Sequence, residues 1–255
     1  MKFEDYSRNF LFFHDEAIPE LLERNLPKND YSLADLGAGD GVLLAALQQA
    51  GYLGKAKPIV AVDLSEDRCD RLRQCTDVTV ICSDVTTIPQ LENSKFDFIM
   101  STQVIEHVDE DKFLHEIERL LNDNGKLYIA SLVSEYGSDK NYMLKYGWRY
   151  GWRFYRKSDG RCLVDPTHLR EYESKEHFVK VIEKAGFQVI ESRLSPLKLS
   201  ALEFLMRRVI VPILKPKDPN GFFMKNKALD YLRKNIKLQP PGYYLVEAIA
   251  VKKID

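Results

Sequence analysis

From Tyr31 onward, short apolar runs alternate along the chain with segments of helical periodicity. Five runs have the length of buried strands and end in polar or glycine residues: SLADLG, PIVAVDLS, VTVICSDV, FDFIMST and GKLYIAS. Between them, apolar residues recur at helical spacing over residues 42–49 and again at Phe113, Ile117, Leu120 and Leu121, before Asn124-Gly125. This alternation predicts an α/β fold built on a parallel sheet with right-handed crossovers.

Further elements are predicted on either side of this pattern. A helical cap is expected over residues 1–30, because apolar residues recur there at helical spacing before Pro27 ends the segment. These residues are Phe10, Phe13, Ala17, Leu21 and Leu22. A helix over 174–185, the strand FQVIESRL and a last strand, YYLVEAIAVKK, follow the fifth strand. The main domain is predicted over 31–255, with insertions at about 136–166 and 196–241.

The first strand ends in the glycine-rich sequence DLGAGDG, which leads into a helix. Gly37 and Gly39 allow a sharp turn and let a ligand approach the backbone, facing the N-terminus of the helix. The dinucleotide fingerprint GxGxxG would require a glycine where Val42 stands, which disfavours NAD.

Two acidic residues follow the next strands at the same edge of the sheet. Asp63 ends the second strand, where a carboxylate can accept both ribose hydroxyls, and Asp84 follows the third, where it can accept from an adenine amino group. Either acid alone would be explained as a helix cap. Together with the glycine loop they predict a nucleoside-binding site.

With these motifs the sequence resembles the class I S-adenosylmethionine-dependent methyltransferases, in particular the small-molecule group of the ubiquinone and menaquinone type. The matching segments are DLGAGDG, AVDLS, SDVTTIP, FDFIMSTQVIEHV and LLNDNGKLYIAS, in order and spacing. The resemblance implies a Rossmann-like, doubly wound sheet of seven mostly parallel strands with an antiparallel last strand, plus helical insertions. It implies S-adenosyl-L-methionine as cofactor, with Asp35, Gly37, Ala38 and Gly39 at its methionine part, Asp63 at the ribose, Asp84 and Val85 at the adenine, and Leu64, Ser101 and Gln103 completing the set.

Two histidines are candidates for catalysis. His107 follows the fourth strand and His168 precedes the helix that leads to the sixth, so both are expected at the carboxyl edge of the sheet. Methyl transfer to a hydroxyl needs alignment and removal of a proton, which a histidine can accept. A hydrogen-bonded structural histidine is the alternative for each.

The pair Glu106-His107 is similar to the ExxEH arrangement that helps hold a divalent metal in ubiquinone-type O-methyltransferases. Here Gln103 stands at the first acidic position. An amide oxygen is a weaker ligand for a hard cation than a carboxylate. We therefore expect no metal.

The two insertions are expected to bind the molecule that accepts the methyl group. NYMLKYGWRYGWRFYRKSDGR interleaves aromatic residues with lysine and arginine, which suits an anionic acceptor, although a lid packed on its own aromatics is an alternative. SALEFLMRRVIVPILKP is basic and amphipathic, which suits a membrane surface or an apolar pocket, although a helix covering its own domain is an alternative. Together they favour a small-molecule or lipid-like acceptor and peripheral contact with an anionic membrane.

Composition and missing motifs disfavour some of the other functional classes. The formal net charge of -1 over 255 residues disfavours a surface built for nucleic acid, and the segment after the fourth strand lacks an NPPY-like motif. An RNA methyltransferase that uses the basic insertion remains an alternative, as does a catalytically silent cofactor-binding module. The four cysteines lack paired spacing, and no signal peptide or long apolar segment is evident, so a cytoplasmic location is expected. The acceptor atom and the oligomeric state are left open.

Overall fold

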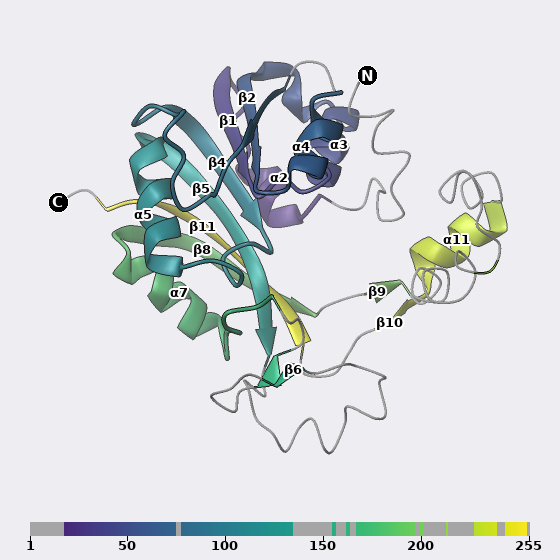
Figure 1. The fold of residues 1–255 in the computed structure, drawn as a ribbon. Coiled ribbons are helices and arrows are strands. Elements are labelled where there is room, and N and C mark those ends of the chain that lie inside the picture. Colours follow the sequence, from purple (N-terminus) through teal and green to yellow (C-terminus); the bar gives the residue numbers. More distant parts are fainter. Residues whose placement is uncertain are drawn as a thin grey trace.

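A seven-stranded sheet forms the centre of the protein in a computed structural model (Figure 1). The structure describes residues 18–74, 78–134, 155–156, 162–163, 167–196, 199–200, 213, 227–238 and 243–253. The strand order is β3-β2-β1-β4-β5-β11-β8. Strand β11 runs antiparallel to β5 and β8, whereas the other neighbouring pairs are parallel. The predicted Rossmann-like sheet with an antiparallel last strand is confirmed.

The strands of this sheet coincide with the predicted apolar runs. They are β1 (Tyr31–Leu36), β2 (Ala56–Asp63), β3 (Thr79–Cys82), β4 (Phe96–Thr102), β5 (Leu121–Ser134), β8 (Phe187–Pro196) and β11 (Tyr243–Lys252). The helices are α2 (Glu20–Asn25), α3 (Val42–Gln49), the 3-10 helix η2 (Tyr52–Lys55), α4 (Glu66–Leu72), α5 (Glu110–Leu120), α7 (Lys175–Lys184) and α11 (Lys227–Asn235). Two short strand pairs, β6 (Tyr155–Arg156) with β7 (Cys162–Leu163) and β9 (Leu199–Ser200) with β10 (Lys237–Leu238), lie outside the main sheet.

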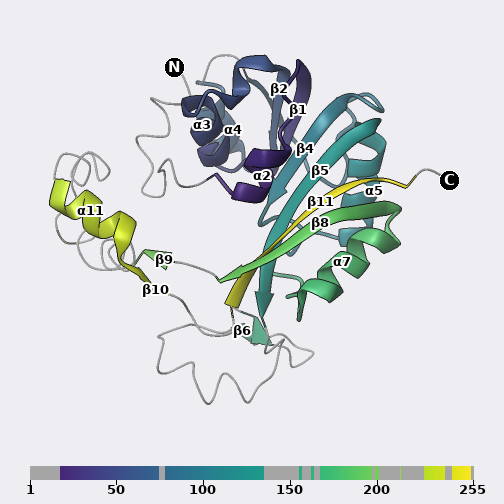
Figure 2. The same ribbon diagram turned by 180° about the vertical axis from the view of Figure 1, so that it is seen from behind.

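Helices cover both faces of the sheet, because alternate residues of each strand point to opposite sides. Leu36 of β1 packs into the cluster that includes apolar residues of α5 and α7, whereas Leu33 packs with α2 and α3. Figures 1 and 2 show α5 and α7 on one side of the sheet and α2 and α3 on the other. Because both faces are buried, the residues at the carboxyl ends of the central strands are held on a rigid frame.

Helix α7 begins and ends at the sequence signals that predict it, whereas α5 ends at Leu120, and Leu121, predicted on its apolar stripe, begins β5. Helix α7 begins after Ser174, whose hydroxyl accepts the amide of His177 at 3.0 Å, and Gly186 with φ +92° follows it. Of the predicted cap over 1–30, residues 1–17 lie outside the described part of the chain, and α2 forms a helix in the remainder.

Most of the two predicted insertions also lies outside the described residues. The aromatic and basic insertion contributes only β6 and β7 to the described residues, and the amphipathic stretch contributes only Ser200, which ends β9, and Ile213. Helix α11 was not predicted by the sequence pattern. In the described part of the chain, no helix is both long and apolar enough to cross a membrane.

Candidate active site

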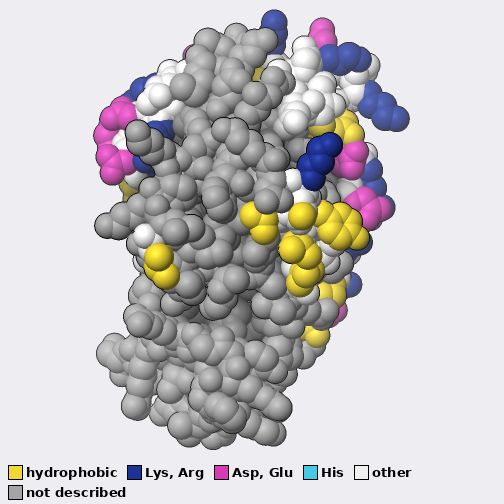
Figure 3. Space-filling view, turned by 90° about the vertical axis from the view of Figure 1, so that its right-hand side faces the viewer, with side chains coloured by type: hydrophobic (Ala, Val, Ile, Leu, Met, Phe, Trp, Pro, Cys, Tyr) yellow, Lys and Arg dark blue, Asp and Glu magenta, His cyan; other side chains and the backbone are white. Residues whose placement is uncertain are grey.

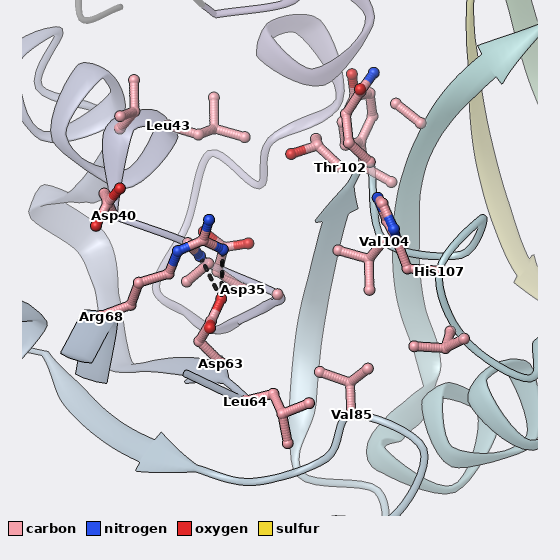
Figure 4. Close-up of a pocket in the computed structure, with 18 of the residues that line it drawn as sticks. Asp35, Asp40, Leu43, Asp63, Leu64, Arg68, Val85, Thr102, Val104 and His107 are labelled. Carbon is pink, nitrogen blue, oxygen red and sulfur yellow. Dashed lines mark hydrogen bonds and ion pairs between the residues drawn. The ribbon is translucent and has the colours of Figure 1, made fainter. Parts of the chain in front are cut away.

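A cavity of about 840 Å³ opens at the carboxyl ends of the central strands (Figure 4). Every cofactor residue predicted from the sequence lines it, with the exception of Ser101. Arg68 and Asp63 stand on one wall, and Val104 and His107 stand on the opposite wall, with open space between them. The parallel strands end together at this edge, which is where doubly wound folds bind their ligands.

The glycine loop brings the backbone into the cavity. Gly37 has φ +81°, and the amides of Gly37 and Ala38 donate to the carbonyl of Val62 at 2.8 and 2.9 Å. A Cβ atom on Gly37 would lie 2.2 Å from Cγ2 of Val104, so a larger residue cannot fit there. The loop between β1 and α3 thus packs directly against the loop after β4.

Asp63 is held by the backbone around it. Its Oδ2 accepts the amide of Gly39 at 2.8 Å and its Oδ1 accepts the amide of Ser65 at 2.9 Å. Nη1 of Arg68 lies 3.8 Å from Oδ2. These contacts fix the carboxylate at the mouth of β2, as expected for an acceptor of ribose hydroxyls.

Asp35 lies at the bottom of the cavity and is only 2% exposed. Burial, reinforced by the negative charge of Asp63, raises the pKa of Asp35 from 3.8 to about 8. Near pH 7 this carboxyl is mostly protonated. A ligand that brings a positive charge would favour its ionised form.

The end of β4 differs from the prediction at one residue. Ser101 lies inside the strand rather than past its end, is 1% exposed, and donates its hydroxyl to the carbonyl of Leu36 at 2.8 Å. Thr102 lines the cavity instead, followed by Gln103. Neighbouring strand residues face opposite ways, so an error of one position moves a side chain from the cavity to the core.

The structure brings both candidate histidines together but gives them different positions. His107 lines the cavity, and its Nδ1 lies 2.9 Å from Oγ1 of Thr167. His168 is 4% exposed and packs edge-on against His107, with ring centroids 4.6 Å apart. Among the described residues His168 does not line the cavity, so His107 is the histidine that faces the open space.

Glu106 lies beside these histidines and is 1% exposed. Among the described residues, neither of its carboxylate oxygens has a hydrogen-bond partner. Burial raises the pKa of Glu106 despite the opposing charges of His168 and Arg170. Donor atoms of Glu106, His107 and His168 lie within 4.8 Å of one another, so the three could also coordinate a cation. The sequence placed both histidines at the carboxyl edge of the sheet, but it could not show that the three side chains meet, because His168 is far from the other two along the chain.

Comparisons with known proteins agree with this geometry. Residues 34–129 match the family model described as "Methyltransferase domain". The chain is 30% identical over 132 residues to an uncharacterized protein of Methanocaldococcus jannaschii, covering 50% of this chain and 54% of that protein. It is 27% identical over 112 residues to the ubiquinone biosynthesis O-methyltransferase of Bartonella tribocorum, covering 42% of this chain and 43% of that enzyme. The matches therefore span about half the length of these curated relatives.

Solved structures show the same fold at low sequence identity. One is the phosphoethanolamine N-methyltransferase 2 of Haemonchus contortus with phosphomonomethylethanolamine and S-adenosylhomocysteine, at 19% identity and a TM-score of 0.57, covering 94% of this chain and 52% of that one. Another is the geranyl diphosphate C-methyltransferase of Streptomyces coelicolor with Mg²⁺, geranyl diphosphate and S-adenosylhomocysteine, at 14% identity and a TM-score of 0.53, covering 92% and 78%. The glycine loop, the two strand-end carboxylates and the match of residues 34–129 to a methyltransferase domain agree with the predicted resemblance to the class I S-adenosylmethionine-dependent methyltransferases.

Proposed function

We propose that this protein transfers the methyl group of S-adenosylmethionine to a hydroxyl group of a small acceptor, and that His107 receives the acceptor's proton. The observation that carries the proposal is the position of His107 on the cavity wall opposite Asp63, the residue predicted at the ribose (Figure 4). A base in that place faces a nucleophile bound between it and the cofactor.

The charges that line the cavity support a cationic cofactor. Four carboxyl groups line it, those of Asp35, Asp40, Asp63 and Asp84, and Arg68 is the one lysine or arginine among its described lining residues. S-adenosylmethionine carries a positive sulfonium and an ammonium group, which this environment attracts. Asp35 at the bottom is the group whose charge would respond most to such a ligand.

The reaction requires a displacement in line with the breaking bond. The acceptor oxygen forms a bond to the methyl carbon while the bond between that carbon and sulfur breaks. The electron pair of the broken bond stays on sulfur, which gives neutral S-adenosylhomocysteine. The hydroxyl proton passes to His107, whose ring Thr167 and His168 hold in place. Removing the proton as the bond forms avoids a positively charged oxygen.

The cavity walls favour a compact acceptor with an apolar body. Its volume of about 840 Å³ is within the range of small-molecule sites, and Leu43, Val104, Val108 and Leu245 are among its lining residues. The name of the Bartonella relative, a ubiquinone biosynthesis O-methyltransferase, favours a hydroxyl on an aromatic ring as the acceptor group. We therefore place small hydroxylated aromatic compounds first among candidate acceptors.

Peripheral membrane contact and a lipid-like acceptor stay predictions. They rest on the amphipathic stretch, of which the structure describes only Ser200 and Ile213, and Ile213 is 72% exposed. Figure 3 shows hydrophobic side chains of the described residues gathered on one face, with lysine or arginine beside them. Binding to anionic vesicles that salt abolishes would support the contact.

The test combines cofactor binding with turnover on hydroxylated aromatic acceptors. We expect S-adenosylhomocysteine to bind the wild-type protein and His107→Asn alike, whereas the variant loses about 10²- to 10⁴-fold in kcat. His115→Asn, at a side chain that is 81% exposed, is the matched control and should keep full turnover. Equal turnover of His107→Asn and the wild type would remove His107 from the mechanism.

The two alternatives predict different results. Tight, salt-sensitive binding of RNA together with methylation of RNA would indicate an RNA methyltransferase. Cofactor binding without methylation of any acceptor class would indicate a catalytically silent module.

A further inference from the structure

Arg170 connects two parts of the site that are far apart in sequence. Its Nη1 donates to the carbonyls of Ile105 and Val108 at 2.8 and 2.6 Å. Its Nε lies 3.3 Å from Oε2 of Glu110, which also accepts the hydroxyl of Tyr172 at 3.1 Å. One guanidinium group thus binds the loop between β4 and α5 at two carbonyls and the first residue of α5 at its carboxylate.

Neighbouring contacts join the same two segments. The amide of Leu169 donates to the carbonyl of Glu106 at 2.8 Å, and Thr167 contacts His107. The segment 167–172 therefore lies along the loop over its whole length. Arg170 is the member of the set with a permanent charge, and hydrogen bonds from charged donors are the stronger ones.

The loop that Arg170 binds forms one wall of the cavity. It contributes Gln103, Val104, His107 and Val108 to the lining. Gln103 has φ +59°, a left-handed conformation that is strained for a residue other than glycine. Such strain persists only where the surroundings fix the backbone. The close approach of Val104 to Gly37 leaves this wall little freedom to shift.

We propose that Arg170 is a positioning residue that keeps the cofactor-facing wall formed by the β4–α5 loop in its binding geometry. Without the guanidinium the carbonyls of Ile105 and Val108 lose their described side-chain donor, and the strained loop relaxes away from the glycine loop. The cofactor then loses contacts with the residues of this wall. The inference rests on cofactor binding in this cavity, the first part of the proposed function, and not on the acceptor.

The test measures the dissociation constant of S-adenosylhomocysteine by calorimetry for the full chain. We expect Arg170→Ala to bind about 3- to 30-fold more weakly than the wild type, a range typical of substitutions that alter binding without contact to the ligand. Millimolar guanidinium chloride should restore part of the affinity by refilling the vacated space, because Arg170 is 25% exposed and its site is reachable. The dissociation constant of Arg170→Lys should lie between those of the wild type and Arg170→Ala. An ammonium group cannot make all three contacts of the guanidinium group, to two carbonyls and one carboxylate.

Arg119→Ala is the matched control. Arg119 also donates to two backbone carbonyls, those of Leu91 and Ile88, and its side chain is 26% exposed, but neither Leu91 nor Ile88 lines the cavity, whereas Val108 does. We expect it to lower thermal stability and to leave the dissociation constant unchanged. This comparison separates positioning of the wall from a general loss of stability.

Each result has a defined meaning. Weaker binding by Arg170→Ala that guanidinium partly reverses, with unchanged binding by Arg119→Ala, supports the proposal. Unchanged binding by Arg170→Ala, or equal weakening by both variants, overturns it. If Arg170→Ala does not fold, Arg170→Lys decides, and wild-type affinity in that variant overturns the proposal. Failure of the wild-type protein to bind S-adenosylhomocysteine would instead contradict the proposed function.

Discussion

In samples without added cofactor, replacing Asp35 by asparagine should stabilise the protein increasingly as the pH rises. In the folded protein the pKa of Asp35 is about 8, whereas 3.8 is the value for an unperturbed aspartate. Between these two values the unfolded chain has lost a proton that the folded protein keeps. The free energy of unfolding therefore falls with increasing pH over this window, because the unfolded state binds fewer protons. An asparagine side chain at this position does not titrate and removes this dependence.

The magnitude follows from the width of the window. Each pH unit inside it is worth about 1.4 kcal/mol, so the advantage of Asp35→Asn over the wild type should grow by about 3 kcal/mol between pH 5 and pH 7.5. Because Asp35 is 2% exposed, solvent screening does not reduce this figure. Denaturant unfolding of both proteins at several pH values measures the difference directly.

A control and a second measurement complete this test. Asp123→Asn, at a side chain that is 90% exposed, should run parallel to the wild type across the same pH range. Asp35→Asn should also weaken binding of S-adenosylmethionine, since a neutral amide cannot offset the charges of the cofactor. A stability difference that stays constant from pH 5 to pH 7.5 would refute our account of the buried carboxyl group.

Three further predictions concern the loop, the ribose site and the ion cluster. Gly37→Ala should abolish cofactor binding and destabilise the fold more than Gly51→Ala, because both glycines have φ above +80° but only a Cβ atom on Gly37 would meet another residue. Equal effects of the two substitutions would exclude the contact with Val104 as the cause. Arg68→Met should tighten binding of S-adenosylhomocysteine about 1.5- to 5-fold, since Arg68 competes with the ribose for Asp63. Arg73→Met, at a residue outside the cavity, should leave the dissociation constant measured by calorimetry unchanged. Chelation with EDTA should leave methyl transfer unchanged if a histidine accepts the proton, and activity lost to EDTA and restored by Mg²⁺ would assign a metal to the Glu106 cluster.

Several features of the fold and of the cofactor site could be predicted because they are local. The apolar runs specify strands, and the alternation with helices specifies a parallel sheet. In such a sheet the strands end at one edge, so Gly37, Asp63 and Asp84 are brought to the same cavity without knowledge of any side-chain contact. The positions of these three residues at the ends of successive strands were sufficient to predict that they share one site.

Other features depend on contacts between distant segments, which the sequence pattern does not contain. Ser101 and Thr102 are neighbours in β4, but the side chain of Ser101 points into the core and that of Thr102 lines the cavity. A shift of one position along a strand is enough to exchange these two directions. His107 and His168 looked alike in the sequence, but the packing of 167–172 against the β4–α5 loop places only one of them on the cavity wall.

The sequence by itself determined the class of fold, the cofactor family and the edge of the sheet where the site lies. The tertiary structure decided which side chains face the cavity, the raised pKa of Asp35 and the contacts of Arg170. The physical reason is that strand and helix formation follows periodicity within a few residues of the chain. Burial, charge proximity and hydrogen bonds across 62 to 65 positions exist only once the segments have packed together.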